Sequence, residues 1–167
     1  MTTANLYNNL KLAKTEEDVK DIYIKALGLK RYNKGLDLID IRTDEIWFEA
    51  KNKSNTSTYA MFTQLLYYVQ VDLDAGEKIP PLLAVIDVEK AALMKTIDVL
   101  PLLKKKNIKW GKSASKLTKE AIDAVSAYIG THFVSFKLST HEEEFISTVK
   151  AAIKSGDIIP RKLLPTI

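Results

Sequence analysis

Acidic side chains stand inside two runs of residues that otherwise have the composition of β-strands. The first run covers residues 36–43 and includes Asp40, and the second covers residues 46–51 and includes Glu49 and Lys51. Carboxylates are rare in strand interiors, and they are costly to bury unless they are paired or bound to a cation. Their position among Leu, Ile, Trp and Phe therefore indicates a chemical role.

The turn between the two runs decides which side chains meet. If Asp44 and Glu45 form a two-residue turn, Asp40 lies directly opposite Glu49 with the Cβ atoms about 5 Å apart, and Lys51 points to the same face. Both carboxylates would then be able to share one divalent cation. Such a cation polarises a phosphoryl oxygen and activates a water that the lysine orients or helps to deprotonate, so the arrangement predicts a metal-dependent hydrolytic site.

The same residues allow two other arrangements. A three-residue turn would place Asp37 opposite Lys51 and Ile39 opposite Glu49, so Asp37 competes with the later acid as the first metal ligand. The two runs would also suit a surface hairpin whose polar side chains face the solvent and have no chemical role. The polar residues 52–58 that follow leave that face open to an approaching phosphate group.

The elements that must position these side chains are those of an α/β fold. Capping residues, glycine stops and helical spacing predict helices over residues 6–13, 15–28, 57–71, 97–105, 119–129 and 140–154. The apolar run 82–88 predicts a central strand covered on both faces, and shorter strands are expected over residues 91–94 and 133–138. We therefore expect a mixed central sheet that carries the site on a β-hairpin and is flanked by helices.

Composition excludes several classes of protein. With 167 residues, 46% of them hydrophobic, the chain is long enough for one domain, which we place at residues 1–155. The absence of cysteine excludes a disulfide scaffold, an iron–sulfur cluster and a cysteine nucleophile. With no secretory signal and no membrane span, we expect a cytoplasmic location. The apolar, proline-containing tail, residues 156–167, is expected to lead into further domains of a longer protein.

Asp40 followed by Glu49-Ala50-Lys51 resembles the D…(D/E)-x-K signature of the PD-(D/E)xK nuclease superfamily, although no proline precedes the first acid. The succession of helix, hairpin, helix and strand over residues 15–100 is similar to the core of these nucleases. The resemblance implies a restriction-endonuclease-like fold.

The helix expected after the hairpin extends this resemblance. In the superfamily that helix bears a glutamine, here Gln64, and Tyr68 four residues later matches the Q-x-x-x-Y pattern of one branch. The sequences of residues 46–51 and 61–67 are similar to those of N-terminal nuclease domains in large restriction–modification polypeptides that also carry an adenine methyltransferase. Tyr68 equally suits a buried helix face.

The resemblance implies a Mg²⁺-dependent endonuclease, with Mn²⁺ as a substitute, that hydrolyses phosphodiester bonds of double-stranded DNA in a restriction–modification enzyme. Asp40 and Glu49 would be metal ligands, with the Ala50 carbonyl as a third. Lys51 would be the catalytic ammonium, and Gln64 would help to hold the lysine, the water or the phosphate. Fusion to methyltransferase or helicase domains, and dimerisation for double-strand cleavage, are implied as well.

Two other functions suit the same sequence. A nuclease fold with an inactive site would bind DNA through the six lysines of residues 104–116, or dock a partner through residues 158–164. A structural domain without a nucleic-acid role would be expected to hold Asp40 and Glu49 on opposite faces, too far apart for one cation.

Two further pairs of residues complete the sequence expectations. Glu16 and Glu17 suit the first turn of the helix over residues 15–28, where the helix dipole favours acids, and either would be able to join the site. His132 and His141 have no cysteine partners in the sequence, so a zinc site is not expected there.

Overall fold

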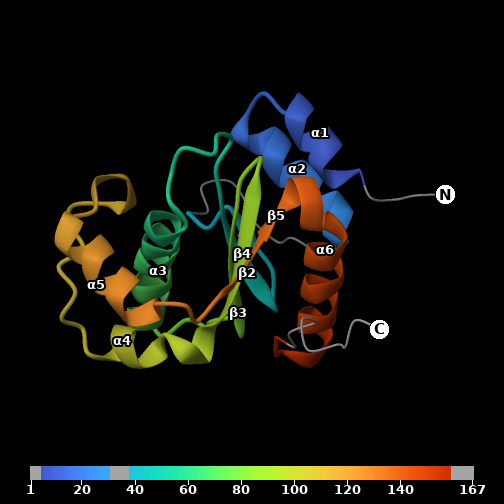
Figure 1. Ribbon diagram of the computed structural model, residues 1–167. Helices are drawn as coiled ribbons and strands as arrows, with labels where there is room; N and C mark the ends of the chain where they lie inside the picture. The colour runs from blue at the N-terminus through green and yellow to red at the C-terminus, as the bar shows by residue number, and fades with distance from the viewer. Residues whose placement is uncertain (1–4, 31–37, 159–167) are drawn as a thin grey trace.

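The computed structural model describes residues 5–30 and 38–158 of the chain. Within these ranges the elements form a sheet with helices on both faces (Figure 1). The strands are β1 (Ile41–Arg42), β2 (Ile46–Ala50), β3 (Leu82–Ile86), β4 (Lys90–Lys95) and β5 (Val134–Lys137). The α-helices are α1 (Leu6–Leu12), α2 (Glu16–Leu27), α3 (Thr58–Asp74), α4 (Leu100–Lys104), α5 (Lys119–Ile129) and α6 (Leu138–Ser155). Two 3₁₀ turns precede α4 and α5, namely η1 (Thr96–Asp98) and η2 (Ala114–Lys116).

The sheet has the strand order β1-β2-β3-β4-β5, so β3 lies at its centre. β2 and β3 run parallel, whereas the other three neighbouring pairs are antiparallel. Every residue of β3 is buried, as expected for an apolar run that is covered on both faces. The prediction of a mixed central sheet with a hairpin and flanking helices is therefore confirmed.

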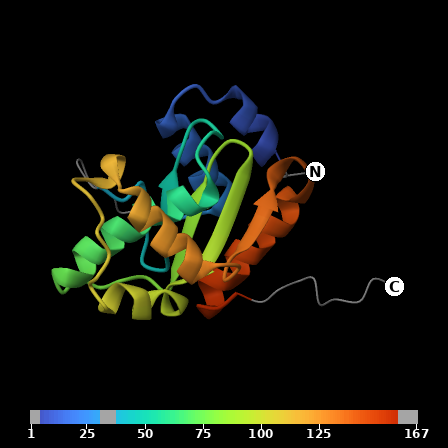
Figure 2. The same ribbon diagram turned by 60° about the vertical axis from the view of Figure 1, so that its left-hand side comes forward.

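Two separate cores lie on the two faces of this sheet. α1, α2 and α6 pack on the face that carries Phe48 and Ala50, and α3, α4 and α5 pack on the face that carries Trp47 and Val85. In Figure 1 the second group lies to the left of the sheet and α6 to its right, and Figure 2 shows the same layers after rotation. Because successive strand residues point to opposite faces, β2 contributes to both cores. None of the helices within the described ranges is long and apolar enough to cross a membrane.

Thr43 fixes the turn of the β1–β2 hairpin. Its backbone N–H and its hydroxyl donate to the Ile46 carbonyl at 3.2 and 2.7 Å, and the Ile46 N–H donates back to the hydroxyl at 2.9 Å. The Trp47 indole N–H donates to the Thr43 carbonyl at 3.1 Å. These bonds are buried, and they hold Asp44 and Glu45 as a two-residue turn with one register.

β1 and the C-terminal tail are described only in part. β1 consists of Ile41–Arg42, and the start of the expected run 36–43, with Asp37, lies outside the described residues. The tail expected over residues 156–167 is described as far as Ile158. The alternative ligand Asp37 and the link to further domains therefore stay predictions.

Three helices differ from the expected ones by more than one residue at an end, and the first is α3, which runs to Asp74 rather than ending at residue 71. The helix expected over residues 97–105 is divided into η1 and α4, because Pro101 has no N–H with which to continue a helix and instead occupies the first turn of α4. α6 begins at Leu138, directly after β5, rather than at Thr140. Its backbone leaves helical geometry at His141, where φ is −130°, so the first turn is offset from the rest.

α2 is held by contacts at its N-terminus, along its length and at its C-terminus. The Asp18 N–H donates to Thr15 Oγ1, and the Thr15 N–H donates to Asp18 Oδ2, both at 3.1 Å, which forms a capping box. The Tyr23 hydroxyl donates to the Asp87 carbonyl at 2.6 Å and thereby joins α2 to the end of β3. Gly28 ends the helix in the left-handed conformation, with φ 63°. The first turn of α2 is thus placed beside the hairpin.

Thr15→Ala is expected to lower the free energy of unfolding by about 1 kcal/mol, because the first turn of α2 loses its side-chain acceptor. Urea unfolding measures the change. Thr131→Ala is the matched control, since Thr131 is exposed and lies in the loop after α5, and it should change stability by less than about 0.5 kcal/mol. Equal losses in both variants would contradict the capping role.

Candidate active site

The hairpin brings Asp40 and Glu49 together at the end opposite its turn. β1 and β2 pair Ile41 with Phe48, and the same register continued by one residue places Asp40 opposite Glu49. Asp40 Oδ2 accepts a hydrogen bond from the backbone N–H of Ala50 at 2.7 Å, which fixes this carboxylate across the two strands. The register expected for a two-residue turn is confirmed, and the arrangement with a three-residue turn is wrong.

Lys51 stands beside this pair, where β2 leaves the sheet. Its Nζ lies 3.2 Å from Glu49 Oε2, and its backbone N–H donates to the Ile86 carbonyl at the end of β3. Glu49 and Lys51 are two residues apart in an extended segment, so their side chains project to the same side. The structure thus brings together the two carboxylates and the ammonium group that the sequence singles out.

Glu49 is a buried acid, only 5% exposed. It alternates with Phe48 and Ala50 and shares the face of Trp47, which α3 covers. The alternative of a surface hairpin with a wet polar face is therefore wrong. The side chains of Asp40 and Lys51 are 15% and 26% exposed, and solvent reaches the site from their side.

Burial sets the protonation of the two acids. It raises the pKa of Glu49 from 4.5 to about 8, the charge of Asp40 adds to this rise, and Lys51 opposes it. Burial also raises the pKa of Asp40, against the effect of the Ala50 N–H and the Lys20 ammonium. Two adjacent carboxylates with little solvent resist ionising together. A divalent cation would favour the ionised form of both.

α2 supplies ionisable side chains from the other side of the hairpin. Lys20 Nζ lies 3.5 Å from Asp40 Oδ1 and 3.5 Å from Glu17 Oε1. The pKa of the partly buried Glu16 is raised, first by burial and then by the charge of Asp40. Glu16, one of the two acids that the sequence leaves open, is therefore electrostatically coupled to the site. Lys20 is not among the residues that the sequence singles out, although its i, i+4 spacing from Glu16 places both on one face of α2.

α3 covers the site with Tyr68 and holds Gln64 one turn earlier. The pKa of Tyr68 is raised by burial and then by the charges of Glu49 and Asp40, so its hydroxyl lies within their electrostatic reach. Gln64 Nε2 donates to the Ala114 carbonyl at 3.2 Å, and no donor among the described residues reaches its buried Oε1. The amide nitrogen of Gln64 is thus engaged with the segment before α5. Its role toward lysine, water or phosphate stays a prediction.

The site offers a metal ion only a few ligands, and these are carboxylate oxygens. Among the described residues, no group of three or more His, Cys, Asp and Glu side chains is arranged to hold a metal ion. Asp40 and Glu49 nevertheless suit Mg²⁺, which binds through one or two carboxylates and keeps several of its waters. The Ala50 N–H is directed to Asp40, and the part of the Ala50 carbonyl as a third ligand stays a prediction.

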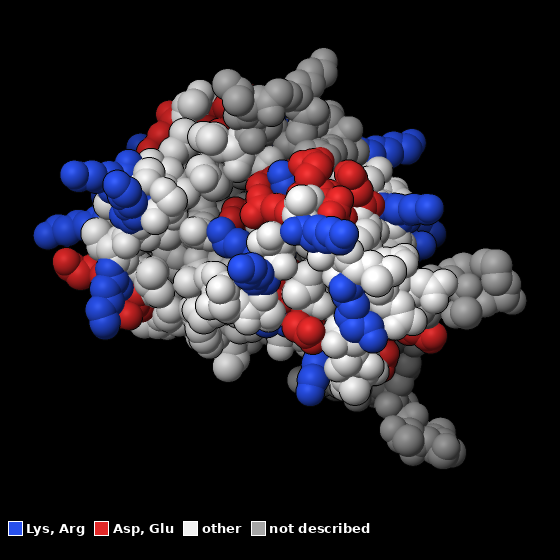
Figure 3. All heavy atoms as spheres, turned by 90° about the horizontal axis from the view of Figure 1, so that it is seen from above, with Lys and Arg blue, Asp and Glu red and all other residues white. Residues whose placement is uncertain are grey.

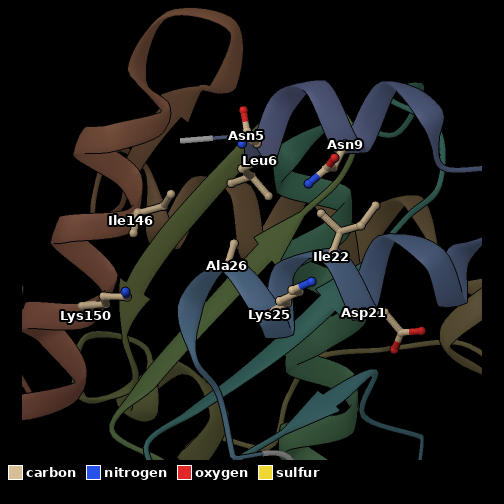
Figure 4. A pocket seen from close by; sticks show the side chains of 9 residues that line it. All are labelled: Asn5, Leu6, Asn9, Asp21, Ile22, Lys25, Ala26, Ile146 and Lys150. Atoms are coloured by element: carbon tan, nitrogen blue, oxygen red, sulfur yellow. The ribbon is translucent and has the colours of Figure 1, made fainter. Parts of the chain in front are cut away.

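A hollow of about 650 Å³ lies elsewhere, between α1, α2 and α6 (Figure 4). Its ionisable lining consists of Asp21, Lys25 and Lys150, and none of the candidate site residues takes part. Concave pockets are the usual first place to seek a binding site. Here the perturbed carboxylates lie outside the hollow, and they are the stronger indication of chemistry.

The arrangement as a whole pairs the buried Glu49 with the partly buried Asp40, with Lys51 at 3.2 Å from Glu49 and Lys20 at 3.5 Å from Asp40. Such a cluster is able to bind a hard cation and to place an ammonium group next to it. Comparison of the chain with protein-family models, with curated proteins and with solved structures finds no match, so this geometry is the basis for assigning a function.

Proposed function

We propose that the chain is a Mg²⁺-dependent deoxyribonuclease domain of the PD-(D/E)xK type with a restriction-endonuclease-like fold. The observation that carries the proposal is the pairing of the partly buried Asp40 with the buried Glu49, with Lys51 held 3.2 Å from Glu49. A buried acid with a pKa near 8 is unfavourable for folding and is best explained by a function that needs it. The order hairpin, α3, β3 agrees with the resemblance on which the family assignment depends.

In this proposal each residue has a distinct task. Asp40 and Glu49 would hold the cation, which when bound would polarise a phosphoryl oxygen and activate a water. The Ala50 N–H keeps the Asp40 carboxylate in one orientation before the cation arrives. Glu49 releases its proton to solvent before it binds, because its pKa in the metal-free protein is about 8.

Lys51 acts on the reacting groups. Its ammonium lies beside Glu49 and is therefore placed to orient the attacking water and to offset negative charge on the phosphoryl oxygens. The water oxygen forms a bond to phosphorus while the bond from phosphorus to the leaving oxygen breaks. The water proton passes to solvent or to the leaving oxygen, so the products are a phosphomonoester and a hydroxyl end.

The biological setting belongs to the same proposal. Double-stranded DNA is the substrate, and the domain acts as the cleavage part of a restriction–modification enzyme that carries methyltransferase or helicase domains. Two copies would be needed to cut both strands at one position, since each chain contributes one carboxylate pair. Mn²⁺ is expected to replace Mg²⁺ because it has the same preference for oxygen ligands.

The test is cleavage of plasmid and linear duplex DNA by the 167-residue chain with Mg²⁺ or Mn²⁺. Asp40→Asn is expected to lower cleavage by about 100-fold or more, because the cation loses one of two charged ligands. Asp44→Asn, an equal change at the exposed hairpin turn, should cleave like the wild type. Cleavage that survives EDTA, or equal activity of both variants, would contradict the proposal. DNA binding without any cleavage would favour the inactive binding module.

A further inference from the structure

The segment between α4 and α5 carries a concentration of positive charge that the cleavage site does not use. We call residues 104–116 the lysine loop, because they include six lysines and no acid. All six side chains are exposed: Lys104, Lys105, Lys106, Lys109, Lys112 and Lys116. One of them, Lys106, lies 3.5 Å from Asp74 of α3. Within the described ranges no acidic side chain forms an ion pair with the other five lysines, so most of the charge faces solvent.

The lysine loop has a defined shape. Gly111 and Leu117 form an isolated antiparallel bridge, and the Thr118 N–H donates to the Trp110 carbonyl at 2.9 Å. Gly111 adopts φ 109°, and a Cβ at this position would come within 2.4 Å of the Lys116 carbonyl oxygen. Only glycine suits that turn. The lysines are therefore displayed from a fixed backbone.

The lysine loop is also fastened to α3, the helix that covers the carboxylates. Gln64 donates to the Ala114 carbonyl at 3.2 Å. The ring of Tyr67 packs against Trp110 at 5.9 Å between centroids and against Tyr68 at 5.6 Å. The charges of Glu49 and Asp40 contribute to the raised pKa of Tyr68, so Tyr68 lies near the acid pair. One side of α3 thus joins the lysine loop to the candidate site.

Seen from above (Figure 3), the acidic side chains are concentrated in one place, whereas the basic side chains are spread more widely. Lys and Arg side chains lie at the left, over α5 and the lysine loop, and others surround one dense acidic patch to the right of the middle, while a few acidic side chains also lie at the left (Figure 3). A polyanion is attracted to the lysines and repelled by the acidic patch. The side of the lysine loop, away from the acidic patch, is therefore the more favourable one for binding a nucleic acid.

We propose that the lysine loop binds the phosphate backbone of double-stranded DNA and holds the duplex beside α3. Lysine ammonium groups contact phosphates without reading bases, so this binding would be independent of sequence. Proteins that bind single strands offer free aromatic faces for bases to stack on, whereas Trp110 is partly buried and packed against Tyr67. This inference rests on the proposed function, because it supplies the substrate affinity for the same site.

The test measures binding separately from cleavage. Fluorescence anisotropy of a labelled duplex in EDTA is followed across a series of KCl concentrations. The loop variant carries Lys109→Gln, Lys112→Gln and Lys116→Gln. The control variant removes the same charge from α2 and α6, on the other face of the sheet, with Lys25→Gln, Lys150→Gln and Lys154→Gln.

The loop variant is expected to bind about tenfold or more weakly at moderate salt, with a salt slope shallower by about 0.9 for each lysine that contacts a phosphate. The control variant should stay close to the wild type. Equal binding by the two variants, or tighter binding of a single strand or an RNA duplex than of the DNA duplex, overturns the inference. With Mg²⁺, the loop variant should raise KM and leave kcat unchanged.

These outcomes separate the inference from the proposed function. If the wild type cleaves DNA and both triple variants have the same KM as the wild type, the proposed nuclease function stands and the proposed role of the lysine loop is wrong. If the chain binds DNA through the lysine loop but does not cleave it, the proposed binding surface stands and the proposed nuclease function is wrong. A wild-type chain that neither binds nor cleaves DNA overturns both.

Discussion

Glu49→Gln is expected to stabilise the metal-free protein at alkaline pH and to abolish its response to Mg²⁺. Burial and the charge of Asp40 raise the pKa of Glu49 from 4.5 to about 8. The folded state therefore holds a proton that the unfolded state releases. The contribution of Glu49 to stability is therefore greatest below pH 4.5, falls as the pH rises toward about 8, and then stays level. A neutral glutamine avoids that loss, which we expect to be a few kcal/mol.

Thermal unfolding in EDTA at acidic and alkaline pH measures this effect. The wild type should lose stability between the two, and Glu49→Gln should lose much less from this source. Glu45→Gln is the matched control, since Glu45 lies exposed in the hairpin turn of the same strand pair. If Glu49→Gln were less stable than the wild type at alkaline pH, the buried acid would be a structural asset rather than a functional one.

Addition of Mg²⁺ gives the second half of the same prediction. At alkaline pH the cation binds the folded wild type and not the unfolded chain, so the unfolding temperature should rise with Mg²⁺ concentration. Glu49→Gln keeps the oxygen acceptor and loses the charge, and its unfolding temperature should not respond. Cleavage should be lost in the same variant. A shift of the unfolding temperature equal to that of the wild type would contradict the metal site.

The geometry of the hairpin was predictable because it depends on contacts between near neighbours. A two-residue turn at Asp44 and Glu45 suffices to place Asp40 opposite Glu49, and Thr43 secures that turn with bonds to residues three and four positions away. The same holds for the helix boundaries at caps and glycines. Local rules of this kind leave little freedom for an alternative register.

The rest of the site depends on which helix lies over which face of the sheet. Lys20 reaches Asp40 because α2 is held by the bond from Tyr23 to Asp87, which are 64 residues apart. Gln64 meets a carbonyl 50 residues away. No local spacing contains these contacts. The burial of Glu49 also depends on a contact between distant elements. The alternation along β2 predicts two faces, but only the packing of α3 shows that the face with Glu49 is covered.

Lys51→Gln is expected to lower kcat by about 1,000-fold or more. The variant loses the ammonium group that orients the attacking water and offsets negative charge on the phosphoryl oxygens. DNA binding in EDTA should be unchanged, since the lysine loop and not Lys51 supplies that affinity in our proposal. Lys53→Gln removes an exposed charge two residues later and should cleave like the wild type. Equal kcat in the two variants would exclude Lys51 from the reaction.

The same substitution has a second consequence that a purely catalytic role would not produce. Lys51 lowers the pKa of Glu49, so its removal raises that pKa further. Glu49 must lose its proton to hold the cation, and the pH at which Mg²⁺ begins to stabilise the protein should therefore move upward in Lys51→Gln. Thermal unfolding with and without Mg²⁺ across a pH series measures this shift. A shift in pH with full kcat would mean that Lys51 acts only by tuning Glu49, whereas loss of kcat at every pH places its ammonium at the reacting phosphate.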